Sequence, residues 1–250
     1  MAVSIKSARE IELMREAGKR LAHVHQELEA MIAPGISTWE IDAKGEKLIR
    51  DCGCIPNFLH YNGYPASICV SVNDEVVHGI PRKDRYLKEG DIVSLDAGLI
   101  YKGYHSDAAR TYAVGKVSTE AQKLMDVTKQ SFFEGIKMAK EGQHLHDISR
   151  AIEEYVTPYG YGIVRDLVGH GIGTALHEDP QIPNYAQKRR GVRLQAGMTL
   201  AIEPMINAGT WQVRFLRDGW TVVTKDGSLS AHYENTILVT DGEPEILTLY

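Results

Sequence analysis

An internal repeat constrains the fold of this chain more than any other feature of its sequence. The residue pairs that recur 107 positions apart include Gly35 with Gly142, Gly53 with Gly160, Gly90 with Gly197 and Asp96 with Glu203. This period is far longer than that of a solenoid, so it predicts two copies of a helix–helix–sheet unit. We expect a single α+β domain over residues 1–250, with pseudo-symmetric halves at about 1–116 and 117–250. The two halves would share a central antiparallel sheet with helices outside.

The periodicity of apolar residues gives the expected elements of each half. Four helices are predicted, at 7–32, 38–52, 118–140 and 145–158. In the first, apolar residues recur at steps of three and four, and Ser37 is placed to cap the second. The stretches expected to form strands are 67–72, 90–104, 107–114, 163–169, 198–206 and 233–239.

The composition excludes several classes of protein. The net charge is −5, and the basic segment 187–193 is expected to be a solvated loop, so nucleic acid is not an expected partner. No apolar run approaches the ~18 residues that span a membrane, and the N-terminus lacks a signal peptide. The three cysteines, Cys52, Cys54 and Cys69, predict reduced thiols and a cytoplasmic protein.

Acidic residues stand in segments that otherwise look like buried strands. Asp96 and Asp107 flank an expected turn near Tyr101–Gly103. A two-residue loop at Tyr101-Lys102 would place the two aspartates directly opposite each other, and one at Lys102-Gly103 would make them diagonal neighbours on one face. A three-residue loop would put them on opposite faces.

The second half offers a similar pair of acids. Glu203 aligns with Asp96, and Glu234 is expected to match Asp107 in a hairpin whose loop is about 20 residues longer. Four buried carboxylates cannot all stay ionised without a positive charge nearby. A pair of acids could share a proton, but four acids favour divalent metal ions.

Histidines near these acids extend the candidate site. His170 and His177 lie in the glycine-rich segment GHGIGTALHEDP, and His78 lies in the partial echo VVHGIP. GHGIG lacks the lysine and Ser/Thr of a phosphate loop, so phosphate binding is a weak alternative. Solvated or capping roles are expected for His23, His25, His144 and His146, and no role is assigned to His60, His105 and His232.

The order of these residues resembles the type I methionine aminopeptidases, which are pita-bread metallopeptidases. The resemblance runs from about residue 5 to 249 and rests on NDEVVHGIP, LVGHGIG…HEDPQIPNY and DGWTVVTKDGSLSAHYENTI. It implies the pita-bread fold. It also implies a chain that begins directly with the catalytic domain, without the N-terminal extension of some relatives.

The resemblance also implies a role for each matching position. The five metal ligands would be Asp96, Asp107, His170, Glu203 and Glu234. They would hold two divalent ions (Co, Mn, Fe, Zn or Ni) with a water or hydroxide between them. Glu203 would move a proton, His177 would donate to the oxyanion, and His78 would bond near the scissile nitrogen.

A methionine pocket and a third cation site follow from the same resemblance. The pocket would be formed by Phe58, Tyr61, Tyr64, Cys69, His78, Leu176, His177 and Trp220. Phe58 and Leu176 depart from the family pattern, in which a small Cys and a Phe are common, and the two changes together could conserve volume. A monovalent cation is expected near Asn73, Glu75 and Ser230.

The expected function is hydrolytic removal of N-terminal methionine from nascent chains, with a small second residue preferred. The partners would be polypeptide N-termini at the ribosome, and the protein would be a monomer. Two alternatives remain open: an Xaa-Pro peptidase of the same fold, and a non-catalytic pita-bread protein that binds ribosomes or peptides.

Overall fold

A computed structural model describes residues 3–249 of the chain, and all four predicted helices are confirmed. They are α1 (Ala8–Glu29), α2 (Thr38–Asp51), α3 (Thr119–Ile136) and α4 (Leu145–Val156). Capping boxes start the first two: Ser7 and Glu10 for α1, and Ser37 and Glu40 for α2. Each box satisfies backbone N–H groups that have no partner within the helix. Two short 3₁₀ turns, Tyr61–Gly63 and Thr157–Tyr159, complete the helical elements of the described residues.

The strands form one large sheet and two small ones. The strands of the large sheet are β1 (Ile55–Pro56), β2 (Ile68–Val72), β4 (Ile92–Tyr101), β5 (Tyr104–Ala113), β7 (Gly169–Gly171), β8 (Glu178–Ile182), β9 (Thr199–Ile202), β14 (Glu234–Leu238) and β15 (Glu245–Ile246). The small sheets contain β6 (Gly162–Ile163), β10 (Met205–Asn207) and β13 (Ser230–His232), and β3 (Glu75–Val77), β11 (Val213–Phe215) and β12 (Val222–Thr224). The predicted strand at 198–206 is divided into β9 and β10. Pro204 interrupts it, because proline has no N–H for a sheet hydrogen bond.

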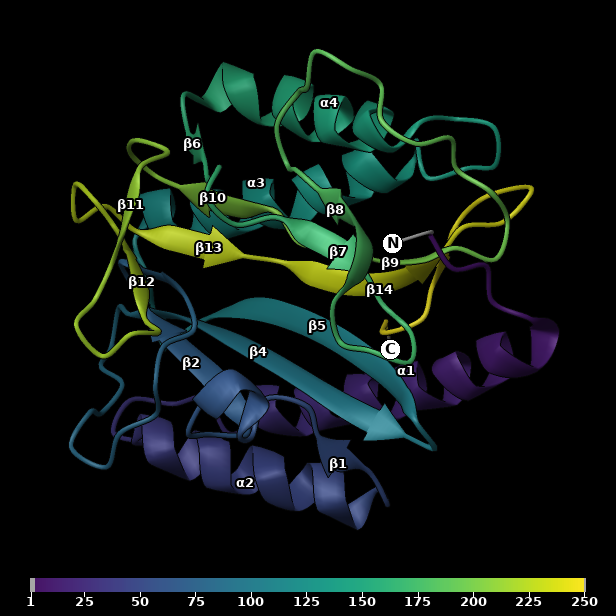
Figure 1. The fold of residues 1–250 in the computed structure, drawn as a ribbon. Coiled ribbons are helices and arrows are strands. Elements are labelled where there is room, and N and C mark those ends of the chain that lie inside the picture. Colours follow the sequence, from purple (N-terminus) through teal and green to yellow (C-terminus); the bar gives the residue numbers. More distant parts are fainter. Residues whose placement is uncertain (1–2, 250) are drawn as a thin grey trace.

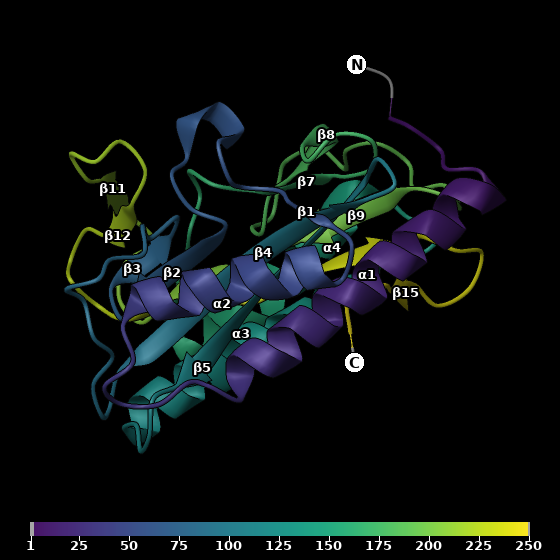
Figure 2. The same cartoon turned by 90° about the horizontal axis from the view of Figure 1, so that it is seen from below.

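The helices cover one face of the central strands and leave the other face for a site. In Figure 1, α1 and α2 lie along β4 and β5, while α3 and α4 lie over the strands of the second half. Figure 2 shows α1 and α2 side by side across the strands. The residues of β4 that pack against these helices alternate along the strand: Val93, Leu95, Ala97 and Leu99. Asp96 therefore points to the opposite face, because successive strand residues alternate between faces.

The turn between β4 and β5 settles the relation of the two aspartates. Lys102 and Gly103 have φ of 48° and 85°, the positive values required at both central residues of a type I′ turn. Asp96 pairs with Ala109, and Gly98 pairs with Asp107. The aspartates are therefore diagonal neighbours on one face, and the alternative that placed them directly opposite is wrong.

The second half repeats this hairpin with a different pairing of acids. Ile202 pairs with Asn235, and Met205 pairs with His232, so one register runs through both strand pairs of this hairpin. In this register, Glu234 takes the position of Ala109, and His232 takes that of Asp107. The expected match of Asp107 with Glu234 is therefore wrong by two residues, because the length of the intervening loop does not reveal the register.

The architecture confirms the predicted α+β class with a central antiparallel sheet and outer helices. Strands from both halves join the large sheet, and the assignment of 1–250 to a single catalytic domain stays a prediction. Among residues 3–249, no helix combines the length and hydrophobicity needed to cross a membrane. Cys52, Cys54 and Cys69 are free thiols.

Candidate metal centre and substrate pocket

The strand register brings four carboxylates to one face of the sheet. Ala109 pairs with Asp96 on one side and with Glu234 on the other, so these three residues form a row across β4, β5 and β14. Asp107 lies two residues before Ala109 and therefore points to the same face. Glu203 follows Ile202, and the next step of the β9–β14 register places it opposite Glu234.

His170 joins this cluster from the neighbouring strand β7. It pairs with Ala201, which lies two residues before Glu203 and shares its face. Its Nε2 lies 3.6 Å from Oε1 of Glu203 and 3.9 Å from Oδ2 of Asp107. Ligand atoms of Asp107, His170 and Glu234 all lie within 4.8 Å of one another. One ion could therefore contact all three side chains.

The hydrogen bond at Nδ1 of His170 leaves its other nitrogen suited to a metal. Nδ1 lies 2.9 Å from the backbone oxygen of Gly171. A carbonyl oxygen can only accept, so Nδ1 carries the proton and Nε2 keeps its lone pair. This lone pair faces the carboxylates, an arrangement typical of histidines that ligate metals.

The electrostatics of the cluster favour the binding of positive charge. Burial raises the pKa of Asp96 to about 7. The pKa values of Asp107, Glu203 and Glu234 are raised well above their ordinary values, mainly by burial and in addition by the neighbouring carboxylates. Among the described residues, Asp96 Oδ1, Asp107 Oδ1 and Glu234 Oε1 are buried without a hydrogen-bond partner. Unpaired buried oxygens are costly, and divalent ions would satisfy them. The residues present therefore fit the implied metal centre.

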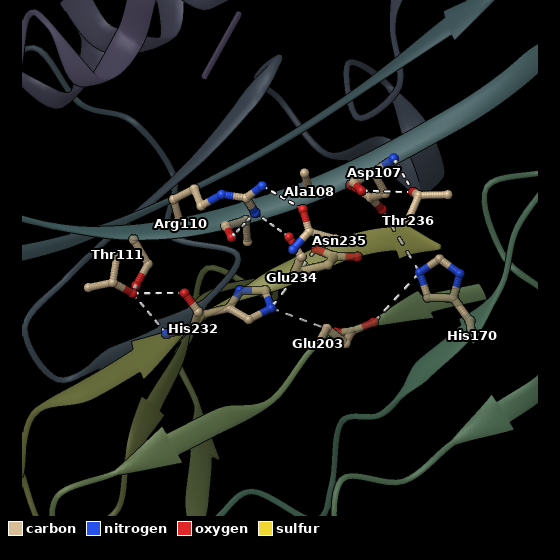
Figure 3. A network of polar contacts seen from close by, with 12 residues as sticks. Asp107, Ala108, Arg110, Thr111, His170, Glu203, His232, Glu234, Asn235 and Thr236 are labelled. Atoms are coloured by element: carbon tan, nitrogen blue, oxygen red, sulfur yellow. Dashed lines mark hydrogen bonds and ion pairs between the residues drawn. The ribbon is translucent and has the colours of Figure 1, made fainter. Parts of the chain in front are cut away.

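A second imidazole, not assigned a role from the sequence, flanks the cluster. Nε2 of His232 lies 3.9 Å from Oε2 of Glu203 and 4.0 Å from Oε2 of Glu234. Figure 3 shows His232 and His170 on opposite sides of Glu203. Burial lowers the pKa of His232 to about 3, so it is neutral. In the second hairpin His232 occupies the position that Asp107 occupies in the first. The sequence offered no other indication of its role, and this one depends on knowing the strand register.

Two basic side chains support the cluster from the reverse face of the sheet. The Arg110 guanidinium is buried and donates to the backbone oxygens of Ala109 and Glu234 and to Oδ1 of Asn235. His25 is fully buried and bonds through Nε2 to the Ala108 oxygen at 2.8 Å. The expectation that His25 is solvated or caps a helix is therefore wrong. This histidine faces β5, and burial lowers its pKa to about 3.

The other histidines have mostly peripheral places. His23 is exposed, His144 precedes α4 and donates its N–H to Asp147, and Nδ1 of His146 bonds the Arg189 oxygen. His60 precedes the Tyr61–Gly63 turn and has φ of 67°, and His105 donates its N–H to the Gly173 oxygen.

A cavity of about 210 Å³ opens directly onto the carboxylate cluster. It brings together every residue predicted for the pocket and all five predicted ligands: Phe58, Tyr61, Tyr64, Cys69, His78, Leu176, His177 and Trp220, with Asp96, Asp107, His170, Glu203 and Glu234. Tyr64 and Trp220 meet edge to face with ring centroids 5.2 Å apart. Asn62 also lines the cavity and was not predicted, because a polar residue in a turn carries no signal of its own.

Contacts of His177 and His78 define the polar part of this cavity. Nδ1 of His177 lies 2.8 Å from the Tyr61 hydroxyl, and the His177 ring lies 4.3 Å from that of His170. His78 packs edge-on to Trp220 at 6.4 Å. Burial lowers the pKa of His78 to about 4 and also lowers that of His177, so both rings are neutral near pH 7.

The expected monovalent cation site remains a prediction. The Ser230 N–H donates to the Asn73 oxygen at 2.9 Å, which brings two of its three members into contact. The carboxylate of Glu75 accepts from the Val72 N–H and pairs with Arg85. An ion at this site would therefore bind the backbone oxygen of Glu75 rather than its carboxylate.

Comparisons with known proteins agree with this geometry. The model of metallopeptidase family M24 matches residues 12–241. A methionine aminopeptidase of Clostridium acetobutylicum is 54% identical over 247 residues, which cover 99% of each chain. Methionine aminopeptidase 1 of Bacillus subtilis is 52% identical over 243 residues, covering 97% of this chain and 98% of that protein. The crystal structure of a methionine aminopeptidase from Thermotoga maritima superposes with a TM-score of 0.97 at 47% identity and covers 100% of both chains.

Proposed function

The chain belongs to metallopeptidase family M24 and has the pita-bread fold, and we propose that it removes the N-terminal methionine of proteins and peptides. One observation carries this proposal: a small, largely apolar cavity ends directly at a cluster of four buried carboxylates and a histidine. A side chain held in the cavity would place the adjoining peptide bond at the cluster.

The lining of the cavity suits a methionine side chain. Phe58, Tyr64 and Leu176 are buried, and Cys69 adds a polarisable sulfur. A thioether makes favourable contacts with aromatic rings, worth ~0.3–1.5 kcal/mol each. The larger Phe58 and the smaller Leu176 line the same cavity, which supports the interpretation that their volumes compensate.

We propose that Asp96, Asp107, His170, Glu203 and Glu234 hold two divalent ions. When bound, such ions polarise a carbonyl group and lower the pKa of a coordinated water. The orphaned oxygens of Asp96, Asp107 and Glu234 and the Nε2 lone pair of His170 support this assignment.

The remaining steps belong to side chains of the chain itself. Glu203, whose pKa is raised by burial and then by Asp107 and Asp96, would accept a proton from the attacking water and pass it to the leaving amine. His177 would donate to the carbonyl oxygen as negative charge develops there. His78, near the Trp220 end of the cavity, would bond close to the scissile nitrogen.

The proposal is tested with a pair of tripeptides. The chain, supplied with Co²⁺ or Mn²⁺, should release methionine from Met-Ala-Ser much faster than from Met-Lys-Ser, because a small second residue is expected to be preferred. Equal cleavage of both peptides, or cleavage of neither, would count against the proposal. Adding Ala-Pro-Phe to the panel separates the Xaa-Pro alternative, which predicts that this peptide is the better substrate.

A further inference from the structure

Two neighbouring histidines of the cavity have Nδ1 partners of opposite chemistry. The rings of His170 and His177 lie 4.3 Å apart. Nδ1 of His170 meets the backbone oxygen of Gly171, which can only accept a hydrogen bond. Nδ1 of His177 meets the hydroxyl of Tyr61, which can donate one.

We infer that Tyr61 is a positioning residue that holds His177 in the tautomer with its proton on Nε2. A neutral imidazole has one donor and one acceptor nitrogen, so the partner of Nδ1 decides what Nε2 can do. The inference rests on the proposed function, because it identifies the group that prepares His177 to donate to a peptide carbonyl.

One observation supports donation from Tyr61 to His177 rather than the reverse. Within residues 3–249 the Tyr61 hydroxyl forms no other hydrogen bond, so its proton is available to Nδ1. With the reverse donation, the hydroxyl would accept from Nδ1, and its own proton would have no partner among these residues.

Both partners of this hydrogen bond are held by their own segments. Tyr61 opens the turn Tyr61–Gly63, where the flanking His60 and the central Asn62 have φ of 67° and 49°. Left-handed conformations of non-glycine residues cost energy and often occur at functional sites. On the other side, the N–H groups of Thr174 and Ala175 donate to Glu178, which fixes the loop that carries His177.

The two tautomers would have opposite effects on a developing oxyanion. With the proton on Nε2, His177 donates to negative charge on the carbonyl oxygen. With the proton on Nδ1, it presents a lone pair that repels this charge. Without the Tyr61 hydroxyl, no hydrogen bond from this residue would favour one tautomer over the other. The aromatic ring would still line the pocket.

The tautomer can be read directly by NMR on the metal-free chain. Two-bond ¹H–¹⁵N spectra of protein labelled with ¹⁵N-histidine distinguish a protonated ring nitrogen from one with a lone pair. The His177 signals are assigned by their loss in His177→Asn. We expect a protonated Nε2 in the wild-type chain and a mixture of tautomers in Tyr61→Phe.

Kinetics of the metal-loaded chain provide the second readout. Tyr61→Phe should lower kcat for Met-Ala-Ser by about tenfold or more. Loss of a hydrogen bond that orients a side chain of the site typically reduces activity by ~10–100-fold. Its KM should change by less than about threefold, since the ring still lines the pocket. Tyr159→Phe, which removes a hydroxyl from an exposed tyrosine outside the cavity, is the matched control and should leave kcat and the spectrum unchanged.

Three results would overturn the inference: a protonated Nδ1 in the wild-type chain, an unchanged tautomer in Tyr61→Phe, or an unchanged kcat in that variant. The wild-type spectrum decides the question even if the variant does not fold. A wild-type chain that cleaves no methionine peptide would refute the proposed function, whereas the spectrum would still test the tautomer.

Discussion

At the scale of single residues, the chemistry of the site depends on what surrounds each group rather than on its type. Asp96, Asp107, Glu203 and Glu234 are ordinary acids whose pKa values rise because they are buried together. His170 becomes a suitable ligand because a backbone oxygen occupies its Nδ1. The site draws on four different strands, β4, β5, β7 and β14, and on the residue that follows β9, so no single motif contains it.

Glu203→Gln tests the proposed proton transfer. The amide cannot accept the proton of the attacking water, so kcat for Met-Ala-Ser should fall by roughly 10²–10⁴-fold. The melting temperature of the metal-free chain should not fall, because the substitution removes one of four mutually repelling carboxyl groups. Both are measured beside Glu154→Gln, an exposed site on α4 that should change neither. Full activity in Glu203→Gln would exclude its role as the proton carrier.

At the scale of elements, local patterns predicted the helices and the strands β2, β4, β5, β9, β10 and β14, but they missed short strands such as β3, β11 and β12. The register was decided by contacts that the sequence does not display. The helix bounds agree within a few residues because apolar spacing and capping serines are local signals. The Lys102-Gly103 turn was one of three open alternatives, and only its positive φ values settle it. The match of Asp107 with Glu234 failed because an inserted loop hides the two-residue shift.

Ala109→Val tests the row of residues that this register creates. Ala109 lies between Asp96 and Glu234, and its small side chain leaves space where their carboxylates converge. Two added methyl groups should displace the ligands and weaken Mn²⁺ binding by about tenfold or more. Titration calorimetry measures the affinity, with Ala113→Val on the same strand and face as the control. Equal affinity in the two variants would contradict the row.

At the scale of the whole molecule, the duplication explains why the site lies where it does. The two hairpins meet at the β5–β14 pair in the middle of the large sheet, and each contributes two acids to the same face. Helices from both halves cover the reverse face, so the acids are buried but open to one cavity. The repeat predicted this arrangement, but it could not reveal His232, His25 or Arg110, whose roles arise from packing between distant segments.

The buried acids make the stability of the metal-free chain depend on pH. The pKa of Asp96 is about 7 in the folded state, and those of the other three acids are well above their ordinary values, so the folded chain binds more protons than the unfolded one. The stabilisation that results is fully present below the pKa that these carboxyl groups have in the unfolded chain. It is lost as the pH rises through the pKa that they have in the folded chain. Histidines with lowered pKa, such as His25 and His232, act in the opposite direction, but only below their unfolded pKa of about 6.5.

Above about pH 6.5 the histidines no longer contribute, and the carboxyl groups should lower the stability by about 1 kcal/mol per pH unit. The melting temperature of the chelator-treated chain should decrease between about pH 6.5 and 8.5, by about 2–4 °C per kcal/mol. Saturating Mn²⁺ should remove the decrease, because bound ions stabilise the ionised carboxylates. A melting temperature that rises with pH in the chelator-treated chain would contradict the assignment of these acids.

The most direct test of the central claim is methionine release from Met-Ala-Ser by chelator-treated chain as Mn²⁺ is added back. If the carboxylate cluster and His170 form the catalytic metal centre, release should be absent without the ion and should rise to a plateau as the site fills. Full release in the presence of excess chelator, or no release at any Mn²⁺ or Co²⁺ concentration, would contradict the account.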